Sequence, residues 1–185
     1  MRLFAASSFG PAFAARLKEI SAYARDKAGR DAVKWVEPGH FHLTYAFLGE
    51  TDKAGAEAAG AALESALADA KAFRVVSGGL GAFPSSRRPS VLWIGFSEGG
   101  DLLRDLAARL AAGLKAAGLG FEDRFEPHVT IGRVKRELPE DFFRRTADFA
   151  ASGHAVSEIV SVELMESVLT REGPVYKPLR SKRLL

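Results

Sequence analysis

Two short polar motifs stand out in the chain, His42-Leu43-Thr44-Tyr45 and His128-Val129-Thr130-Ile131. Both follow the pattern His-x-Thr-x. In an extended strand, side chains two residues apart lie on the same face, so each histidine shares a face with its own threonine. The apolar residues between them then point into the core. A single histidine on a strand usually has a structural role, but two equivalent His-Thr pairs favour a catalytic role.

Paired imidazoles and hydroxyls suit general acid-base phosphoryl transfer. One neutral imidazole takes the proton of the attacking oxygen, and a second, protonated imidazole delivers a proton to the leaving oxygen. Histidine suits both tasks because its unperturbed pKa of about 6.5 leaves both forms accessible near neutrality. Threonine hydroxyls can donate to the phosphate oxygens, where charge spreads in the transition state. A phosphodiester carries a single negative charge, so we expect these donors to suffice without a metal or other cofactor.

His40 is the one candidate metal ligand beside the motifs. It shares strand parity with His42, and the two could form a His-x-His pair. No third ligand of suitable type is evident nearby. We therefore expect no metal site, and we expect His40 to be a solvated residue where the strand begins.

Arg133 and two aromatic residues are further candidates for substrate contact. Strict alternation places Arg133 on the face opposite His128, although a bend at Gly132 could turn it toward the site to contact phosphate or stack on a base. Tyr45 and Phe47 are suitable for base stacking by residue type. Their parity is that of core residues, so we expect both in the core.

The elements that position these residues follow no regular strand-helix alternation, which favours an α+β fold with mainly antiparallel sheet. Amphipathic periodicity and turn residues predict helices over about 11–29, 52–70, 102–117 and 139–149. Strands are expected at 2–8, 33–36, 41–48, 72–80, 90–97, 127–134, 155–169 and 175–184, with a loop over 84–89. No low-complexity linker divides the chain, so we expect one domain over 1–185.

The composition is that of a soluble globular protein, with 47% apolar and 26% charged residues in 185 positions. There is no cysteine, so disulfides and thiolate metal sites are excluded. No apolar run approaches the length of a signal peptide or a membrane span, and we expect a cytoplasmic protein without membrane association. The net charge is +3, and basic residues cluster at 133–136, 144–145 and 177–183, where they could face phosphates.

The sequence resembles the 2H phosphoesterases, most closely the RNA 2′,3′-cyclic phosphodiesterases first named 2′-5′ RNA ligases. The resemblance covers nearly the whole chain and rests on both His-x-Thr motifs in order, with their flanks. The flanking residues that carry it are Phe41 to Glu50, Pro127 to Arg133, Arg2 to Ala6 and Gly173 to Tyr176.

The resemblance implies a bilobal, pseudo-two-fold α+β fold, in which two mainly antiparallel sheets flanked by helices face a central cleft and the two lobes interleave along the chain. It also implies that His42 is the proton donor, His128 the proton acceptor, and Thr44 and Thr130 the phosphate-binding residues. The expected reaction is hydrolysis of RNA 2′,3′-cyclic ends, or of small cyclic nucleotides, to 2′-phosphomonoesters.

Three alternatives stay open. The reverse reaction would ligate a cyclic-phosphate end to a hydroxyl end as a 2′-5′ linkage. A nucleotide-binding module without turnover would not need two titrating groups, and a structural RNA-binding protein would keep its affinity after loss of both histidines. The sequence does not fix the RNA substrate, the base preference or the oligomeric state, for which a monomer is the default expectation.

Overall fold

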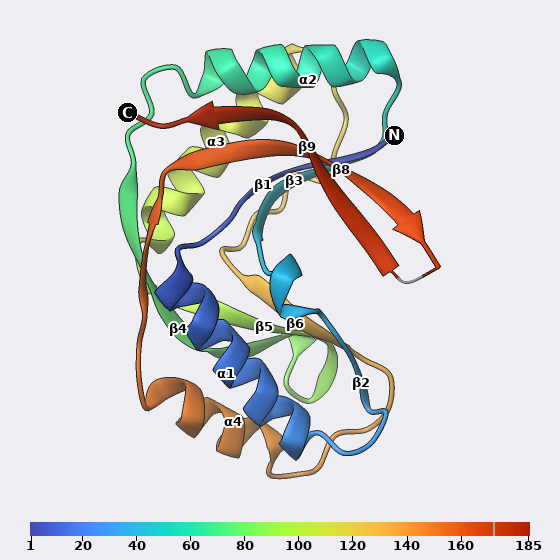
Figure 1. Ribbon diagram of the computed structural model, residues 1–185, viewed down its shortest axis with the longest axis vertical. Coiled ribbons are helices and arrows are strands. Elements are labelled where there is room, and N and C mark those ends of the chain that lie inside the picture. Colours follow the sequence, from blue (N-terminus) through green and yellow to red (C-terminus); the bar gives the residue numbers. More distant parts are fainter. Residues whose placement is uncertain (172) are drawn as a thin grey trace.

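Helices and antiparallel strands are arranged around one curled sheet in the computed structural model, which describes residues 1–171 and 173–185 (Figure 1). The helices are α1 (Pro11–Lys27), α2 (Lys53–Ala66), α3 (Gly100–Ala116) and α4 (Phe142–Ala151), with the short 3-10 helix η1 (Pro38–His40). The strands are β1 (Arg2–Ser7), β2 (Val33–Trp35), β3 (Leu43–Glu50), β4 (Phe73–Ser85), β5 (Arg88–Glu98), β6 (Val129–Val134), β7 (Val156–Ile159), β8 (Ser161–Thr170) and β9 (Gly173–Arg183).

The order of strands in the sheet is β7-β4-β5-β6-β3-β1-β8-β9, with β2 added to β6. Every recorded pairing is antiparallel. The centre of this order is the contact between β3 and β6, where the two strands meet at the single residue pair Leu43 and Val129. Four strands lie on each side of that contact, which confirms the predicted pseudo-two-fold arrangement of an α+β fold.

Each half of the sheet has its own pair of helices. The helices α2 and α3 pack together beside β3, β8 and β9, whereas α1 and α4 pack together beside β4, β7 and β2 (Figure 1). Helix α1 begins with Pro11 at its first turn, where a missing N–H costs nothing, and buries a stripe of apolar side chains at helical spacing. That stripe is Phe13, Leu17, Ile20 and Ala24. No helix in the described part of the chain is long and apolar enough to cross a membrane.

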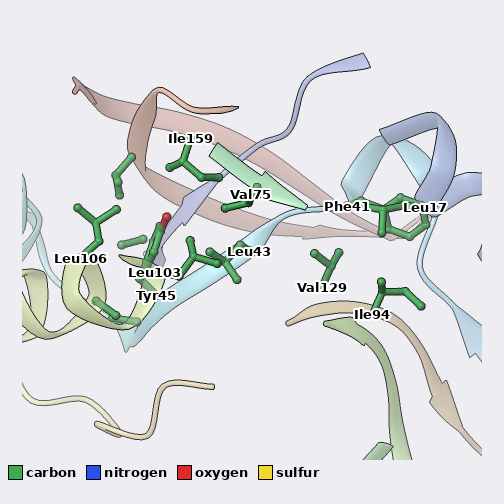
Figure 2. Close-up of a cluster of buried hydrophobic side chains, with 14 of the residues drawn as sticks. Leu17, Phe41, Leu43, Tyr45, Val75, Ile94, Leu103, Leu106, Val129 and Ile159 are labelled. Atoms are coloured by element: carbon green, nitrogen blue, oxygen red, sulfur yellow. The ribbon is translucent and has the colours of Figure 1, made fainter. Parts of the chain in front are cut away.

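One continuous hydrophobic core connects the two halves of the sheet. Leu43 and Val129, the central strand pair, are completely buried in it. Figure 2 shows them with Ile94 of β5, and with Tyr45 and Leu103 on the side of α3. Because the residues that follow the two histidines are fixed by this core, the histidines themselves have fixed positions.

Two expected segment boundaries were wrong. The residues predicted as a loop over 84–89 mostly extend β4 and β5. Pro84 pairs with Pro89 near the end of the hairpin, where the missing N–H groups of proline interrupt few hydrogen bonds between strands. The strand predicted over 155–169 is two strands separated at Val160. There the chain passes from one half of the sheet to the other, since β7 pairs with β4 and β8 pairs with β1.

Candidate active site

The two His-x-Thr motifs are adjacent in the structure. Because Leu43 pairs with Val129 in antiparallel register, His42 comes opposite Thr130 and Thr44 comes opposite His128. The four side chains lie on one face of the sheet, and the side chains of Leu43 and Val129 point from the opposite face into the core. Both histidines lie one residue before their strands rather than inside them, since β3 begins at Leu43 and β6 at Val129.

Both imidazoles are held by the same backbone contact. Nδ1 of His42 lies 2.6 Å from the carbonyl oxygen of His40, and Nδ1 of His128 lies 2.6 Å from the carbonyl oxygen of Glu126. A carbonyl oxygen only accepts hydrogen bonds, so each Nδ1 donates its proton there. This leaves Nε2 of both rings as the reactive nitrogen, which accepts a proton when the ring is neutral and donates one when it is charged.

Aromatic rings surround each imidazole. The ring of His42 lies 5.1 Å from Phe4 and 5.2 Å from Tyr176, and the ring of His128 lies 5.0 Å from Phe83 and 6.2 Å from Trp93. Phe4 and Tyr176 come from segments that carried the family resemblance. Nothing in the sequence singled out Phe83 or Trp93, which lie near the site only through the pairing of β4 and β5 with β6.

Burial in these aromatic surroundings is the main influence on the pKa of both histidines. It lowers the pKa of His42, and the charges of His40 and His128 lower it further, against the raising effect of the His40 carbonyl. Burial also lowers the pKa of His128, whereas the Glu126 carbonyl and carboxylate raise it. Both rings are therefore biased toward the neutral form.

A β-bulge follows each motif at the same distance. On β3, Thr44 pairs with Ala6 and Ala46 pairs with Ala5, so Tyr45 is an extra residue. On β6, Thr130 pairs with Trp93 and Gly132 pairs with Leu92, so Ile131 is an extra residue. An extra residue reverses the alternation of the side chains beyond it. The pattern of burial is accordingly the same over the first five residues after each histidine.

The bulge corrects the prediction for Phe47. Tyr45 is buried as expected, but Phe47 is 63% exposed rather than in the core. Strict alternation would have placed Phe47 on the core face. Beyond the bulge it lies instead on the face of His42 and Thr44, with its ring 5.9 Å from that of Phe4.

Arg133 occupies the equivalent position on β6 and is exposed. The bulge at Ile131 places it on the face of His128 and Thr130, against the simple alternation predicted from the sequence. Its charge lowers the pKa of Tyr176, against the larger raising effect of burial. The position of Arg133 is that of a group bordering the space between the two motifs.

A cavity of about 360 Å³ opens beside His42, within the size range of small-molecule sites. Phe4, Ala6, His40, Glu163 and Tyr176 are among the residues that line it. A larger hollow of about 420 Å³ is lined by Glu140, Asp141 and Arg144 at the start of α4, and none of the motif residues borders it.

The pseudo-two-fold equivalent of this cavity is filled. Ala6 pairs with Thr44 on one side of the sheet, and Trp93 pairs with Thr130 on the other. The Trp93 ring covers Gly81, where an added Cβ would lie only 2.2 Å from it. The small side chain of Ala6 leaves room beside His42, whereas the indole of Trp93 occupies the same room beside His128.

His40 lies in this cavity wall rather than in open solvent. It is half-buried, and its ring is 5.1 Å from that of Tyr176. Within residues 1–171 and 173–185, no group of three or more histidine, aspartate or glutamate side chains is placed to hold a metal ion. The ring of His40 packs on Tyr176, and its charge acts on the pKa of His42.

Comparison with known proteins identifies the family of the chain. The family model of the 2′-5′ RNA ligase superfamily matches residues 9–166. The chain is 36% identical over 184 residues to the RNA 2′,3′-cyclic phosphodiesterase of Archaeoglobus fulgidus, covering 97% of this chain and 98% of that protein. It is 38% identical over 152 residues to the RNA 2′,3′-cyclic phosphodiesterase of Aeropyrum pernix, covering 80% and 84%.

Solved structures share the whole fold. TT0787 of Thermus thermophilus is 27% identical and superposes with a TM-score of 0.79. The match covers 100% of this chain and 98% of TT0787. E. coli LigT, in a complex with 3′-AMP, is 24% identical and superposes with a TM-score of 0.72 over 99% of this chain and 97% of its own. The chain belongs to the 2′-5′ RNA ligase superfamily of 2H phosphoesterases.

Proposed function

We propose that this chain hydrolyses RNA 2′,3′-cyclic phosphodiester ends to 2′-phosphomonoesters, without a metal, through His42 and His128. Relatives that share more than a third of its residues are named RNA 2′,3′-cyclic phosphodiesterases. The pairing of Leu43 with Val129 supports the proposal because it brings two imidazoles and two hydroxyls together on one face of the sheet.

The reaction needs one proton on the two imidazoles. Nε2 of neutral His128 takes a proton from water while the water oxygen bonds to phosphorus. The bond from phosphorus to the ribose O3′ breaks, and Nε2 of protonated His42 gives its proton to O3′. Thr44 and Thr130 donate hydrogen bonds to the equatorial oxygens, where negative charge develops. The product keeps the phosphate on O2′, and proton exchange with solvent resets the two rings.

The observation that carries this division of roles is the unequal space on the two sides. In a 2′,3′-cyclic nucleotide, the leaving oxygen stays attached to its nucleoside, so the general acid must lie where the nucleoside binds. The cavity of about 360 Å³ is beside His42. Water needs no pocket, and on the side of His128 the room is occupied by Trp93.

The same asymmetry favours hydrolysis over ligation. Ligation requires the hydroxyl of a second ribose to replace water beside His128. The rings of Phe83 and Trp93 lie 5.0 Å and 6.2 Å from that imidazole and limit the space for a second nucleoside. Both directions use the same four motif residues, so they differ in substrate access rather than in chemistry.

Alanine substitution of each histidine tests the proposal. His42→Ala and His128→Ala should each lower kcat/KM for a 2′,3′-cyclic nucleotide by roughly 10²-fold to 10⁴-fold, the usual contribution of a general acid or base. Turnover close to wild type in either variant would contradict the proposal. Activity should also survive EDTA.

A substrate with a good leaving group separates the two roles. A nitrophenolate leaves as a stable anion and needs no acid, so His42→Ala should recover much of its deficit on an aryl phosphodiester that the wild type accepts. His128→Ala should stay impaired because water still needs a base. The ratio of mutant to wild-type kcat/KM on each substrate is the measured quantity. Rescue of His128→Ala alone would reverse the assignment.

A further inference from the structure

A carboxylate lies in the cavity beside His42, and the hydrolysis of a cyclic phosphate does not use it. Glu163 of β8 is half-buried and lines the cavity together with Phe4, His40 and Tyr176. The side chain of Glu163 is absent from the ion pairs formed by the described residues. Its recorded hydrogen bond comes from the Ser181 hydroxyl, 3.2 Å from Oε1.

The register of the sheet fixes the distance between the backbones at Thr44 and Glu163. Ala6 pairs with Thr44 on one side and with Glu163 on the other, so the three residues form one row across β3, β1 and β8. Residues paired in this way point to the same face. Two strand spacings separate Thr44 from Glu163, about 9.6 Å. The small Ala6 between them leaves the path open for a ribose and its base.

We propose that Glu163 reads the Watson–Crick edge of the terminal base and makes the site selective for guanosine 2′,3′-cyclic ends. This inference rests on the proposed function, because it assumes that the nucleoside binds beside His42. A carboxylate is an acceptor on both oxygens, with lone pairs left beyond the one that Ser181 uses.

Guanine is the base whose edge matches such a group. Its N1–H and its N2 amino group are adjacent donors that point the same way, and they can bind both oxygens of one carboxylate. Adenine and cytosine each place a ring nitrogen acceptor beside their amino group, and uracil places its N3–H between two carbonyl oxygens. Each of these bases would therefore bring a lone pair against the carboxylate, which disfavours binding.

The aromatic lining fits a stacked base at this place. Phe4 and Tyr176 lie 5.2 Å apart with their rings nearly perpendicular, and both border the cavity between His42 and Glu163. Phe4 is only 3% exposed and supports Tyr176, whose part-exposed ring can stack on any base and so contributes affinity without selectivity. Selectivity then depends on the polar group at the edge of the base, which is the position of Glu163.

The substitution Glu163→Gln tests this proposal because it changes the pattern of donors at nearly constant shape. The carboxamide offers one acceptor and one donor, which match the amino group and ring nitrogen of adenine or cytosine. Wild type should hydrolyse guanosine 2′,3′-cyclic phosphate with a kcat/KM about 10-fold or more above those of the other three nucleotides. The E163Q variant should lose that preference, and its kcat/KM for the adenosine or cytidine substrate should rise relative to guanosine.

A matched control is Glu158→Gln, which removes an exposed carboxylate from β7 in the other half of the sheet. It should leave the order of the four substrates unchanged. An equal loss on all four bases in E163Q would overturn the proposal and indicate a contact with ribose, and an unchanged preference would exclude Glu163 from the base site. If wild type turns over none of the four nucleotides, the proposed hydrolysis fails, whatever the role of Glu163.

Discussion

The residue two positions before each catalytic candidate differs between the motifs. His40 precedes His42, and its charge lowers the pKa of His42, whereas Glu126 precedes His128, and its charge raises the pKa of His128. In both motifs this residue also supplies the carbonyl that holds Nδ1. The backbone contact is thus independent of the side chain, which leaves the side chain free to adjust the proton affinity of the imidazole.

Replacing His40 should shift the pH dependence of the reaction. His40→Asn keeps the carbonyl and removes the imidazole whose electrostatic influence lowers the pKa of His42, so the pKa of His42 should rise. A general acid must be protonated, and the rate falls as pH rises through its pKa. The descending limb of the pH profile of kcat/KM should therefore move to higher pH in this variant.

The apparent pKa values of a pH–rate profile belong to the pair of histidines together. NMR titration of the ring resonances of His42 and His128 can therefore show which histidine has the changed pKa. The resonance of His42 should move to higher pKa, with a smaller change at His128. A descending limb that stays in place or moves to lower pH would contradict the role of His42 as the acid.

At the residue scale, the sequence predicted the polar groups but not what surrounds them. The His-x-Thr spacing places imidazole and hydroxyl on one face in any strand, so the four motif residues could be chosen from the pattern alone. Phe83 and Trp93 reach His128 only because β4 and β5 pair beside β6. Such contacts depend on long-range register, and no local pattern encodes them.

At the scale of the element, two bulges explain why alternation misplaced Phe47 and Arg133. Tyr45 and Ile131 are buried residues of types that are common in strands, and neither residue type indicates a bulge. Only Gly132 gives a local signal, because an added Cβ there would lie 2.5 Å from Val33 and a close approach of β2 requires glycine. The equivalent residue on β3 is alanine, so the sequence could not show that both strands share the feature.

The bulge on β3 makes a prediction for stability. Phe47→Ala should lower the free energy of unfolding by less than about 1 kcal/mol, because most of the ring is already in water. Phe13→Ala, the matched change of a fully buried ring in α1, should cost about 3–5 kcal/mol. Urea unfolding of both variants measures the difference. A cost for Phe47 as large as that for Phe13 would mean that β3 continues without a bulge.

At the scale of the whole molecule, the backbone is nearly symmetric and the side chains are not. Each half of the sheet contributes four strands to the main order, one histidine, and a bulge directly after its motif. Yet Ala6 corresponds to Trp93, Glu163 to Gly81, and Phe47 to Arg133. A reaction with a nucleoside on one side of phosphorus and water on the other requires such an asymmetry. The two motifs in the sequence predict the symmetric part alone.

The structure also divides the basic residues that the sequence grouped together. In the cluster near the C-terminus, Arg180 and Lys182 form ion pairs with Glu57 and Glu64 of α2, 3.3 Å and 3.5 Å away. These two residues attach β9 to a helix. Arg133, by contrast, is exposed and lies beyond the bulge that follows the second motif, and its charge lowers the pKa of Tyr176. Only the second kind of residue is placed to meet the backbone of an RNA that ends beside His42.

The salt dependence of RNA binding should distinguish these two kinds of basic residue. Each phosphate of a single strand that a cation neutralises changes the slope of log K against log salt by about −0.7, because counterions are released. Arg133→Gln should therefore make the slope for a cyclic-phosphate oligonucleotide shallower by about 0.7, whereas Arg180→Gln should leave it unchanged.

A mononucleotide should show a shallower slope than the oligonucleotide with wild type. The affinities can be measured by fluorescence anisotropy at several salt concentrations, with each variant made in His42→Ala protein, which should turn the RNA over roughly 10²-fold to 10⁴-fold more slowly. Equal slopes for the Arg133 and Arg180 variants would show that the RNA backbone does not pass along the edge formed by β6.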